Sequence, residues 1–152
     1  MQADQCRLQK RPRLCEPTVI VTDASVLVTA LADDGASGDH ARARLQGERL
    51  AFPELAYVEV TSALRRLVAA RAVDARRAAL ALRDLQVLPA QVSPHRPLLH
   101  RSWELRDNLT TYDALYVALA EALGATALIA DRRLAHAPRL GCPVEVLTDT
   151  AN

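Results

Sequence analysis

The chain has 152 residues, half of them hydrophobic, and its 19 Lys and Arg nearly balance its 18 Asp and Glu, for a net charge of +1. This length and apolar content suit one domain with a substantial core, and the charge balance excludes a histone-like tail or a polyanionic disordered segment as the main feature. The only lysine is Lys10, which excludes chemistry that needs a lysine in the core, such as Walker-A nucleotide binding or a Schiff base.

Cysteine usage and hydropathy restrict the cellular setting. The three cysteines form no C-x-x-C pair, which excludes a zinc ribbon or disulfide framework and fits a reducing cytosol. The longest uncharged stretch, residues 85–95, is far shorter than the roughly 20 residues that cross a bilayer. We therefore expect a cytoplasmic protein that does not enter a membrane.

Taken in chain order, residues 1–17 are polar and basic and are predicted to form a flexible arm ahead of a single domain over residues 18–152. Apolar, β-branched runs predict strands at residues 19–22, 50–52, 126–130 and 144–147, with a further short strand within 85–92. Helical periodicity and caps predict helices at residues 25–31, 38–45, 54–72, 74–85, 94–107, 110–123 and 132–140. Strands that alternate with helices predict an α/β fold, a three-layer α/β/α sandwich with a central parallel sheet.

Two acidic residues directly follow predicted strands. Asp23 follows the strand at 19–22, and Asp131 follows the strand at 126–130. Ligands of open parallel sheets bind outside the carboxyl ends of the strands, so we expect both carboxylates at one edge of the sheet.

Asp113 lies in the first turn of the helix predicted over 110–123, whose only other charged residue is Glu121. Such an apolar helix should be buried, and a buried carboxylate requires a partner. One interpretation is a capping box formed by Thr110 and Asp113, and the other is a functional site. The two interpretations are compatible.

Glu59 lies at the border of the apolar stripe of the helix predicted over 54–72, so it faces inward. The structural interpretation is an ion pair with Arg66 or with an arginine of a neighbouring helix. If Glu59 and the three aspartates converge, their repulsion requires a neutralising charge, because unit charges about 4 Å apart cost roughly 4 kcal/mol at an effective dielectric of 20. An all-oxygen acidic cluster is the ligand set for Mg²⁺ or Mn²⁺, which points to a nuclease or phosphatase.

Four segments carry a resemblance to a known family. They are VIVTDASVLV, PELAYVEVTSALRR, NLTTYDALYVALAEALGA and ALIADRRLA, in that order, and the likeness as a whole covers about residues 19–147. In sequence and spacing the chain resembles the PIN-domain ribonucleases, specifically the VapC toxins of toxin–antitoxin pairs. Two departures are the arm ahead of the first strand and Ile129, which stands where members often carry Thr or Ser.

The resemblance implies a role for each acidic residue. It places Asp23, Glu59, Asp113 and Asp131 at the four metal-binding and catalytic positions, with Asp131 ranked fourth because of Ile129. Asp23 and Asp113 would bind Mg²⁺, with Mn²⁺ as substitute, Glu59 would orient or deprotonate the attacking water, and Asp131 would hold a second or weaker ion. The resemblance also implies polar pocket positions at two further residues, Ser25 and Asn108.

The implied activity is endonucleolytic cleavage of a structured or translation-related RNA, which halts protein synthesis. The implied partners are the RNA substrate, a VapB-like antitoxin and a second copy of the chain in a homodimer. Apolar helix positions at Leu27, Leu31 and 64–68 could serve such partners, although ordinary core is the more frequent explanation. The alternatives are a PIN-type nuclease that acts in RNA processing or on DNA, and a non-catalytic scaffold that binds RNA or protein.

RNA binding requires local positive charge, because RNA carries one phosphate per nucleotide. Arg132 directly follows Asp131 and is the predicted phosphate contact, while most other arginines of the Ala-rich helices are interpreted as solvated or ion-paired. Aromatic residues make up 3% of the chain, which leaves little for base stacking and favours recognition of backbone shape.

Overall fold

The computed structural model describes residues 18–148, so the arm predicted at 1–17 and the last residues, 149–152, lie outside the described residues. Five parallel strands form one sheet in the order β3-β2-β1-β4-β5. They are β1 (Val19–Thr22), β2 (Arg49–Pro53), β3 (Ala90–Ser93), β4 (Thr126–Ile129) and β5 (Val144–Val146). The chain places β2 and then β3 on one side of β1, and afterwards β4 and then β5 on its other side. The direction in which strands are added to the sheet therefore reverses between β1 and β4.

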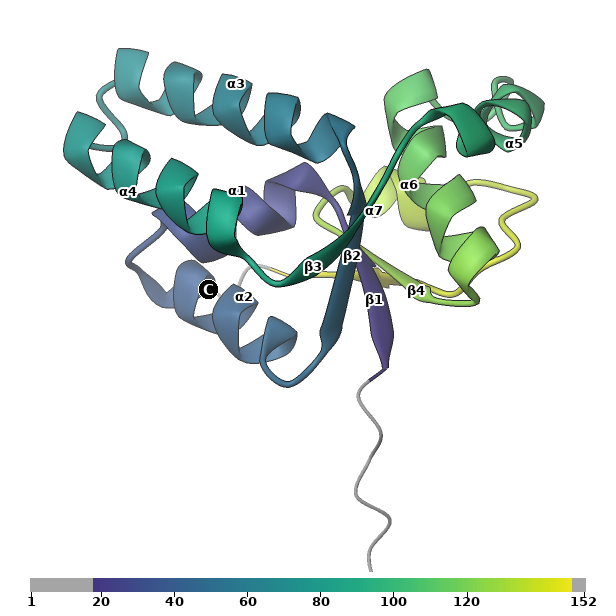
Figure 1. Ribbon diagram of the computed structural model, residues 1–152, viewed down its shortest axis with the longest axis horizontal. Coiled ribbons are helices and arrows are strands. Elements are labelled where there is room, and N and C mark those ends of the chain that lie inside the picture. Colours follow the sequence, from purple (N-terminus) through teal and green to yellow (C-terminus); the bar gives the residue numbers. More distant parts are fainter. Residues whose placement is uncertain (1–17, 149–152) are drawn as a thin grey trace, which may run out of the picture.

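Helices cover both faces of this sheet, as predicted for a three-layer α/β/α sandwich. They are α1 (Ala24–Ala32), α2 (Ala36–Leu45), α3 (Leu55–Ala69), α4 (Ala75–Val87), α5 (Leu99–Glu104), α6 (Thr111–Leu123) and α7 (Arg132–Ala135), with a 3-10 turn, η1 (Arg96–Leu98), before α5. Figure 1 shows α1 to α4 on one side of the sheet and α5 and α6 on the other. None of the helices in residues 18–148 is long and apolar enough to cross a membrane.

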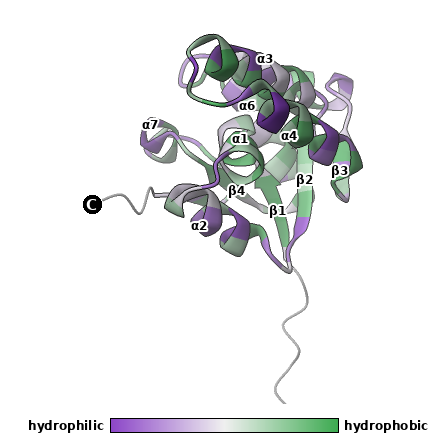
Figure 2. Ribbon diagram, turned by 90° about the vertical axis from the view of Figure 1, so that its left-hand side faces the viewer, coloured by the Kyte–Doolittle hydropathy of each residue, from purple (hydrophilic) through white to green (hydrophobic). Residues whose placement is uncertain are grey.

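The core follows the alternation of side chains along the central strands. Ile20 of β1 and Leu128 of β4 pack with Val26 of α1, whereas Val21 and Ile129 belong to the larger cluster that includes α6. In Figure 2, β1 and β2 are coloured hydrophobic and the outward residues of α2 and α3 hydrophilic.

Helix α6 is as buried as its composition predicts. Every residue from Ala114 to Ala120 is buried. The helix begins at Thr110, whose hydroxyl oxygen accepts the N–H of Asp113, and ends at Gly124, whose φ of 58° is left-handed. The cap at Thr110 is therefore confirmed and fixes Asp113 in the first turn, while the Asp113 carboxylate accepts the Thr110 hydroxyl instead of the main-chain N–H of a reciprocal capping box.

Several predicted boundaries differ from the structure. Helix α3 ends at Ala69 because Arg71 takes a left-handed φ of 57°, and the Ala72 N–H turns back to the carbonyl of Leu67 at 2.9 Å. The helix predicted over 94–107 is shorter and split into η1 and α5, the one over 132–140 ends at Ala135, and the strand within 85–92 occupies Ala90–Ser93.

Some of the apolar helix positions that could contact a protein partner lie in the hydrophobic core instead. Leu27 is 1% exposed and Leu64 is 4% exposed, so the domain itself covers both.

Candidate active site

Asp23 joins two strands at the carboxyl edge of the sheet. It caps α1, its Oδ1 accepting the Val26 N–H at 2.8 Å, while its Oδ2 accepts the Ala130 N–H at 3.0 Å. Ala130 directly follows β4, so Asp23 lies where the strand order reverses, the place where open α/β sheets bind ligands. Burial raises the pKa of Asp23, the two backbone hydrogen bonds oppose this, and the charges of Asp113 and Glu59 raise it further.

Asp113 approaches Asp23 from α6. Its Oδ2 accepts the Thr110 hydroxyl at 2.7 Å, in addition to the backbone contact that begins the helix. Helix α6 precedes the parallel strand β4 and runs back across the sheet, which places its first turn at the carboxyl edge. The capping role and the proximity to Asp23 therefore coexist, because they use the same first turn.

Glu59 approaches from the opposite side, on α3. The main-chain N–H of Leu55 donates to Nε2 of His95 at 2.8 Å, which anchors the first turn of this helix. Oε2 of Glu59 accepts a 2.5 Å hydrogen bond from the hydroxyl of Tyr116 on α6. The structure thus replaces the arginine partner considered for Glu59 with a buried tyrosine, and Arg66 instead donates to Ser62.

Asp23, Asp113 and Glu59 form one electrostatic group. The charges of Asp113 and Glu59 both reach Asp23, and within residues 18–148 none of the three carboxylates forms an ion pair with a basic side chain. Three carboxylates without a basic partner repel one another in a partly desolvated site. The arrangement favours binding of a cation.

The donor chemistry of these carboxylates fits a divalent ion. Mg²⁺ and Mn²⁺ prefer carboxylate oxygens. In the described part of the chain, however, no three His, Cys, Asp or Glu side chains are arranged so that they hold an ion together. Each carboxylate instead accepts a hydrogen bond from its own donor, which is the Ala130 N–H, the Thr110 hydroxyl or the Tyr116 hydroxyl.

Asp131 does not join the other three carboxylates. It caps α7, and its carboxylate contacts the backbone N–H of Arg133 at 2.9 Å and the Arg133 guanidinium at 3.3 Å. Its side chain is 54% exposed. The backbone hydrogen bond, followed by the guanidinium, lowers the pKa of Asp131, so the charge of this ionised carboxylate is paired with exposed Arg133.

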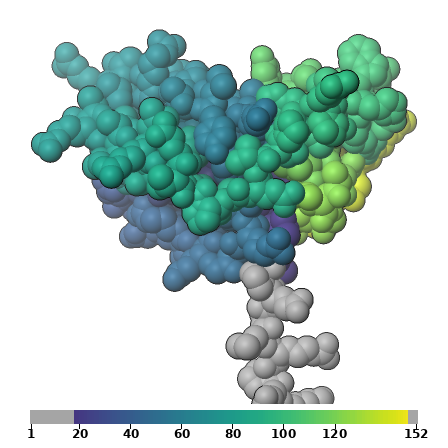
Figure 3. All heavy atoms as spheres, in the orientation of Figure 1, coloured from purple at the N-terminus to yellow at the C-terminus, as the bar shows by residue number. Residues whose placement is uncertain are grey.

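The predicted substrate contacts are spread around this edge. Ser25 and Glu59 help to line a groove of about 680 Å³ between α1 and α3, together with Tyr112 of α6. The side-chain amide of Asn108 donates to the carbonyl oxygen of Pro138 at 3.4 Å and, among the described residues, forms no hydrogen bond with the three carboxylates. Arg132 is exposed and stays a predicted phosphate contact. Figure 3 shows a notch in the surface between α3 and the region of α5 and α6.

Tyr116 and His95 were missed as contributors to the site. Tyr116 lies three residues after Asp113 and therefore shares its helix face, which is a signal that local spacing contains. His95 carried no such signal, because its contact with Leu55 spans 40 residues of chain.

Comparisons with known proteins agree with this architecture. The model of the PIN domain family matches residues 20–140. Ribonuclease VapC1 of Mycobacterium tuberculosis is 43% identical over 128 residues, covering 84% of this chain and 96% of the relative. Ribonuclease VapC9 of the same organism is 40% identical over 129 residues, covering 85% and 98%. The chain belongs to the PIN domain family, and within it to the group of VapC ribonucleases.

A solved structure shares the fold at low identity. VapBC2 from Rickettsia felis, bound to a DNA fragment from its promoter, superposes with a TM-score of 0.62 at 13% identity, covering 85% of this chain and 98% of that chain.

Proposed function

We propose that this chain is a Mg²⁺-dependent endoribonuclease, with Mn²⁺ as a substitute ion, that acts as the toxin of a toxin–antitoxin pair. The observation that carries the proposal is the group of Asp23, Asp113 and Glu59 at the point where the strand order reverses, without a basic partner among the described residues. The VapC ribonucleases to which the chain is 40–43% identical support the reaction class.

Each carboxylate has a distinct task in this proposal. Asp23 and Asp113 hold the ion from two elements, β1–α1 and α6. When bound, the ion stabilises charge on the phosphate and activates water. Glu59, on the facing helix α3, adds a third carboxylate at the ion and orients that water or accepts its proton. Asp131, whose carboxylate is engaged by Arg133, makes a smaller contribution at a second or weaker ion.

The residues around this edge of the sheet suggest how the substrate is held, and the comparisons suggest the protein partners. We propose a structured or translation-related RNA as substrate, held by its phosphates through Arg132 and by polar contacts from Ser25 and Asn108. The proposed protein partners are a VapB-like antitoxin, supported by the VapBC structure that shares the fold, and a second copy of the chain. Cysteine usage supports a cytoplasmic location.

Incubation of the purified protein with total cellular RNA in Mg²⁺ tests the proposal, with the fragment ends mapped. Discrete cuts are expected from wild type and from Asp84→Asn, a variant of an exposed carboxylate on α4. The cuts should be lost in EDTA and in Asp113→Asn. Cleavage that persists in both would refute a metal site at Asp113, and absence of both cleavage and Mn²⁺ binding in wild type would favour a non-catalytic scaffold.

Growth provides a second test in cells. Expression without an antitoxin should arrest growth, and Asp23→Asn should relieve the arrest, because Asn still offers an oxygen to cap α1 but cannot hold a cation as a carboxylate does. Equal arrest by both proteins, at equal expression, would show that cleavage at this site is not its cause.

A further inference from the structure

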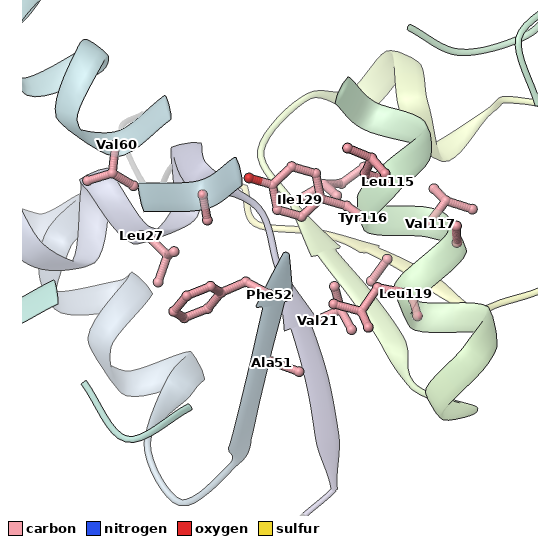
Figure 4. Close-up of a cluster of buried hydrophobic side chains, with 14 of the residues drawn as sticks. Val21, Leu27, Ala51, Phe52, Val60, Leu115, Tyr116, Val117, Leu119 and Ile129 are labelled. Carbon is pink, nitrogen blue, oxygen red and sulfur yellow. The ribbon is translucent and has the colours of Figure 1, made fainter. Parts of the chain in front are cut away.

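Tyr116 connects the two sides of the candidate site. It lies on α6, is 4% exposed, and donates to Glu59 on α3, 57 residues away in sequence. Figure 4 shows its ring extending from α6 with the oxygen directed toward α3. Within residues 18–148 this is the only side-chain hydrogen bond between α3 and α6, so it sets how the Glu59 carboxylate is held opposite Asp113.

The hydrogen bond also distinguishes the two oxygens of Glu59. Oε2 is engaged by the tyrosine, whereas Oε1 accepts no hydrogen bond from the residues that the structure describes. A carboxylate anchored through one oxygen keeps a defined orientation for the other. Partners of this kind outside the ligand set orient the ligands of metal sites, and their removal costs about 10- to 100-fold in metal affinity or activity.

We propose that Tyr116 is a positioning residue, which holds Glu59 through Oε2 so that Oε1 faces the space shared with Asp23 and Asp113. This role rests on the proposed function, because it gives Glu59 a fixed place at the cation and its water. Tyr116 acts through Glu59, and its burial keeps it from contacting the substrate.

The variant that tests this role is Tyr116→Phe, which removes one buried oxygen and keeps the ring. Tyr57→Phe is the matched control, since Tyr57 lies on α3, packs edge-on against Phe52 at 5.5 Å between ring centroids, and takes no part in the hydrogen bond between Tyr116 and Glu59. Mn²⁺ affinity is measured by titration calorimetry without RNA, and thermal unfolding in EDTA verifies that each variant is folded.

Tyr116→Phe should weaken Mn²⁺ binding by about tenfold or more, while Tyr57→Phe should stay near the wild-type affinity. In a Glu59→Gln background, Tyr116→Phe should change the affinity no further, because its effect passes through the Glu59 carboxylate. In single-turnover cleavage, Tyr116→Phe should lower the rate at saturating RNA and leave the RNA concentration for half-maximal rate unchanged, because Tyr116 does not contact RNA.

Three results would overturn the role. Wild-type Mn²⁺ affinity in Tyr116→Phe, with wild type itself binding Mn²⁺, would refute positioning by Tyr116 and leave the proposed function standing. An equal loss of affinity in the Glu59→Gln background would reveal a general effect on the fold. Wild type that binds no Mn²⁺ would refute the proposed function and this role together.

Discussion

The Ala130 N–H donates a 3.0 Å hydrogen bond to Oδ2 of Asp23 across 107 residues of chain. The bond connects the residue after β1 to the residue after β4, so the partly buried carboxylate of Asp23 is held by the sheet itself. Its other oxygen caps α1. Asp23 therefore stabilises the junction of β1, α1 and β4 and is also a candidate ligand.

Repulsion within the site should make Asp113→Asn more stable than wild type in EDTA at neutral pH. Burial first, and then the charges of Asp113 and Glu59, raise the pKa of Asp23 above its usual value of 3.8. Removing the Asp113 charge should increase the free energy of unfolding by an amount on the order of 1 kcal/mol, about 2–4 °C in Tm. Asn can still accept the Thr110 hydroxyl, so the cap is kept.

The pH dependence of this gain has a defined sign. A carboxyl whose pKa is higher in the folded state contributes stability below its unfolded pKa and loses it as the pH rises through the folded pKa. The penalty from ionised Asp23 is therefore present at neutral pH and disappears in acid. The Tm difference between Asp113→Asn and wild type, measured against pH with Asp84→Asn as control, should shrink toward low pH. A constant difference would contradict the repulsion.

A divalent ion should make wild type more stable than Asp113→Asn, the reverse of the order expected in EDTA. Mn²⁺ at about a hundred times its dissociation constant should stabilise wild type by roughly 2.7 kcal/mol, because it binds the folded state only. Asp113→Asn should gain much less, since one of the three carboxylates is gone. Thermal unfolding at increasing Mn²⁺ measures both proteins, and an equal rise in Tm would place the ion elsewhere.

Asp131 should matter less for cleavage than Asp113. Its carboxylate is more than half exposed and is held by Arg133, away from the group around Asp23. Asp131→Asn, which keeps a good helix cap, should slow cleavage by less than about tenfold, and Asp113→Asn by about a hundredfold or more. Single-turnover rates on one mapped RNA decide between them. The reverse ranking would show that Asp131 is a principal ligand.

Glu121 should stabilise the helical layer that carries Asp113. Its carboxylate accepts hydrogen bonds from Nε of Arg101 on α5 at 2.6 Å and from the Gly141 N–H at 2.7 Å. The Arg101 guanidinium, ahead of the Gly141 N–H, lowers the pKa of Glu121, so its contribution is present above its usual value of 4.5 and is lost as the pH falls through the folded value. Glu121→Gln should cost about 1 kcal/mol at neutral pH, because Arg101 is about a third exposed and solvent screens the pair.

The matched control for Glu121→Gln is Glu104→Gln, which removes a charge from the same Arg101 at a side chain that is 47% exposed. Urea unfolding at several pH values should show the Glu121→Gln deficit narrowing in acid and a smaller effect of Glu104→Gln throughout. A deficit that does not depend on pH would show that packing, and not the charge, explains it.

Local chain chemistry is enough to predict most of the elements and to place Asp23 and Asp113 at the starts of two helices. Strand β1 ends at Asp23, helix α6 begins at Thr110 with Asp113 in its first turn, and Gly124 ends it, because periodicity and capping act between residues a few positions apart. The parallel order of strands predicted that Asp23 and Asp131 follow their strands at one edge of the sheet, and the family resemblance placed Asp113 with them. Helix α3 ends earlier than predicted because Arg71 takes a left-handed φ although no glycine or proline stands there, whereas Pro138 lies inside the helix predicted over 132–140 and is a local signal for its earlier end at Ala135.

Only the tertiary structure decided where the carboxylate groups point. Glu59 faces Tyr116 instead of an arginine, and Asp131 turns to Arg133 although its backbone follows the strand beside Asp23. The sequence by itself determined which residues stand at the carboxyl edge of the sheet. It did not determine their hydrogen-bond partners, because a side-chain rotamer depends on what the packed layers bring near it, and those neighbours lie tens of residues away along the chain.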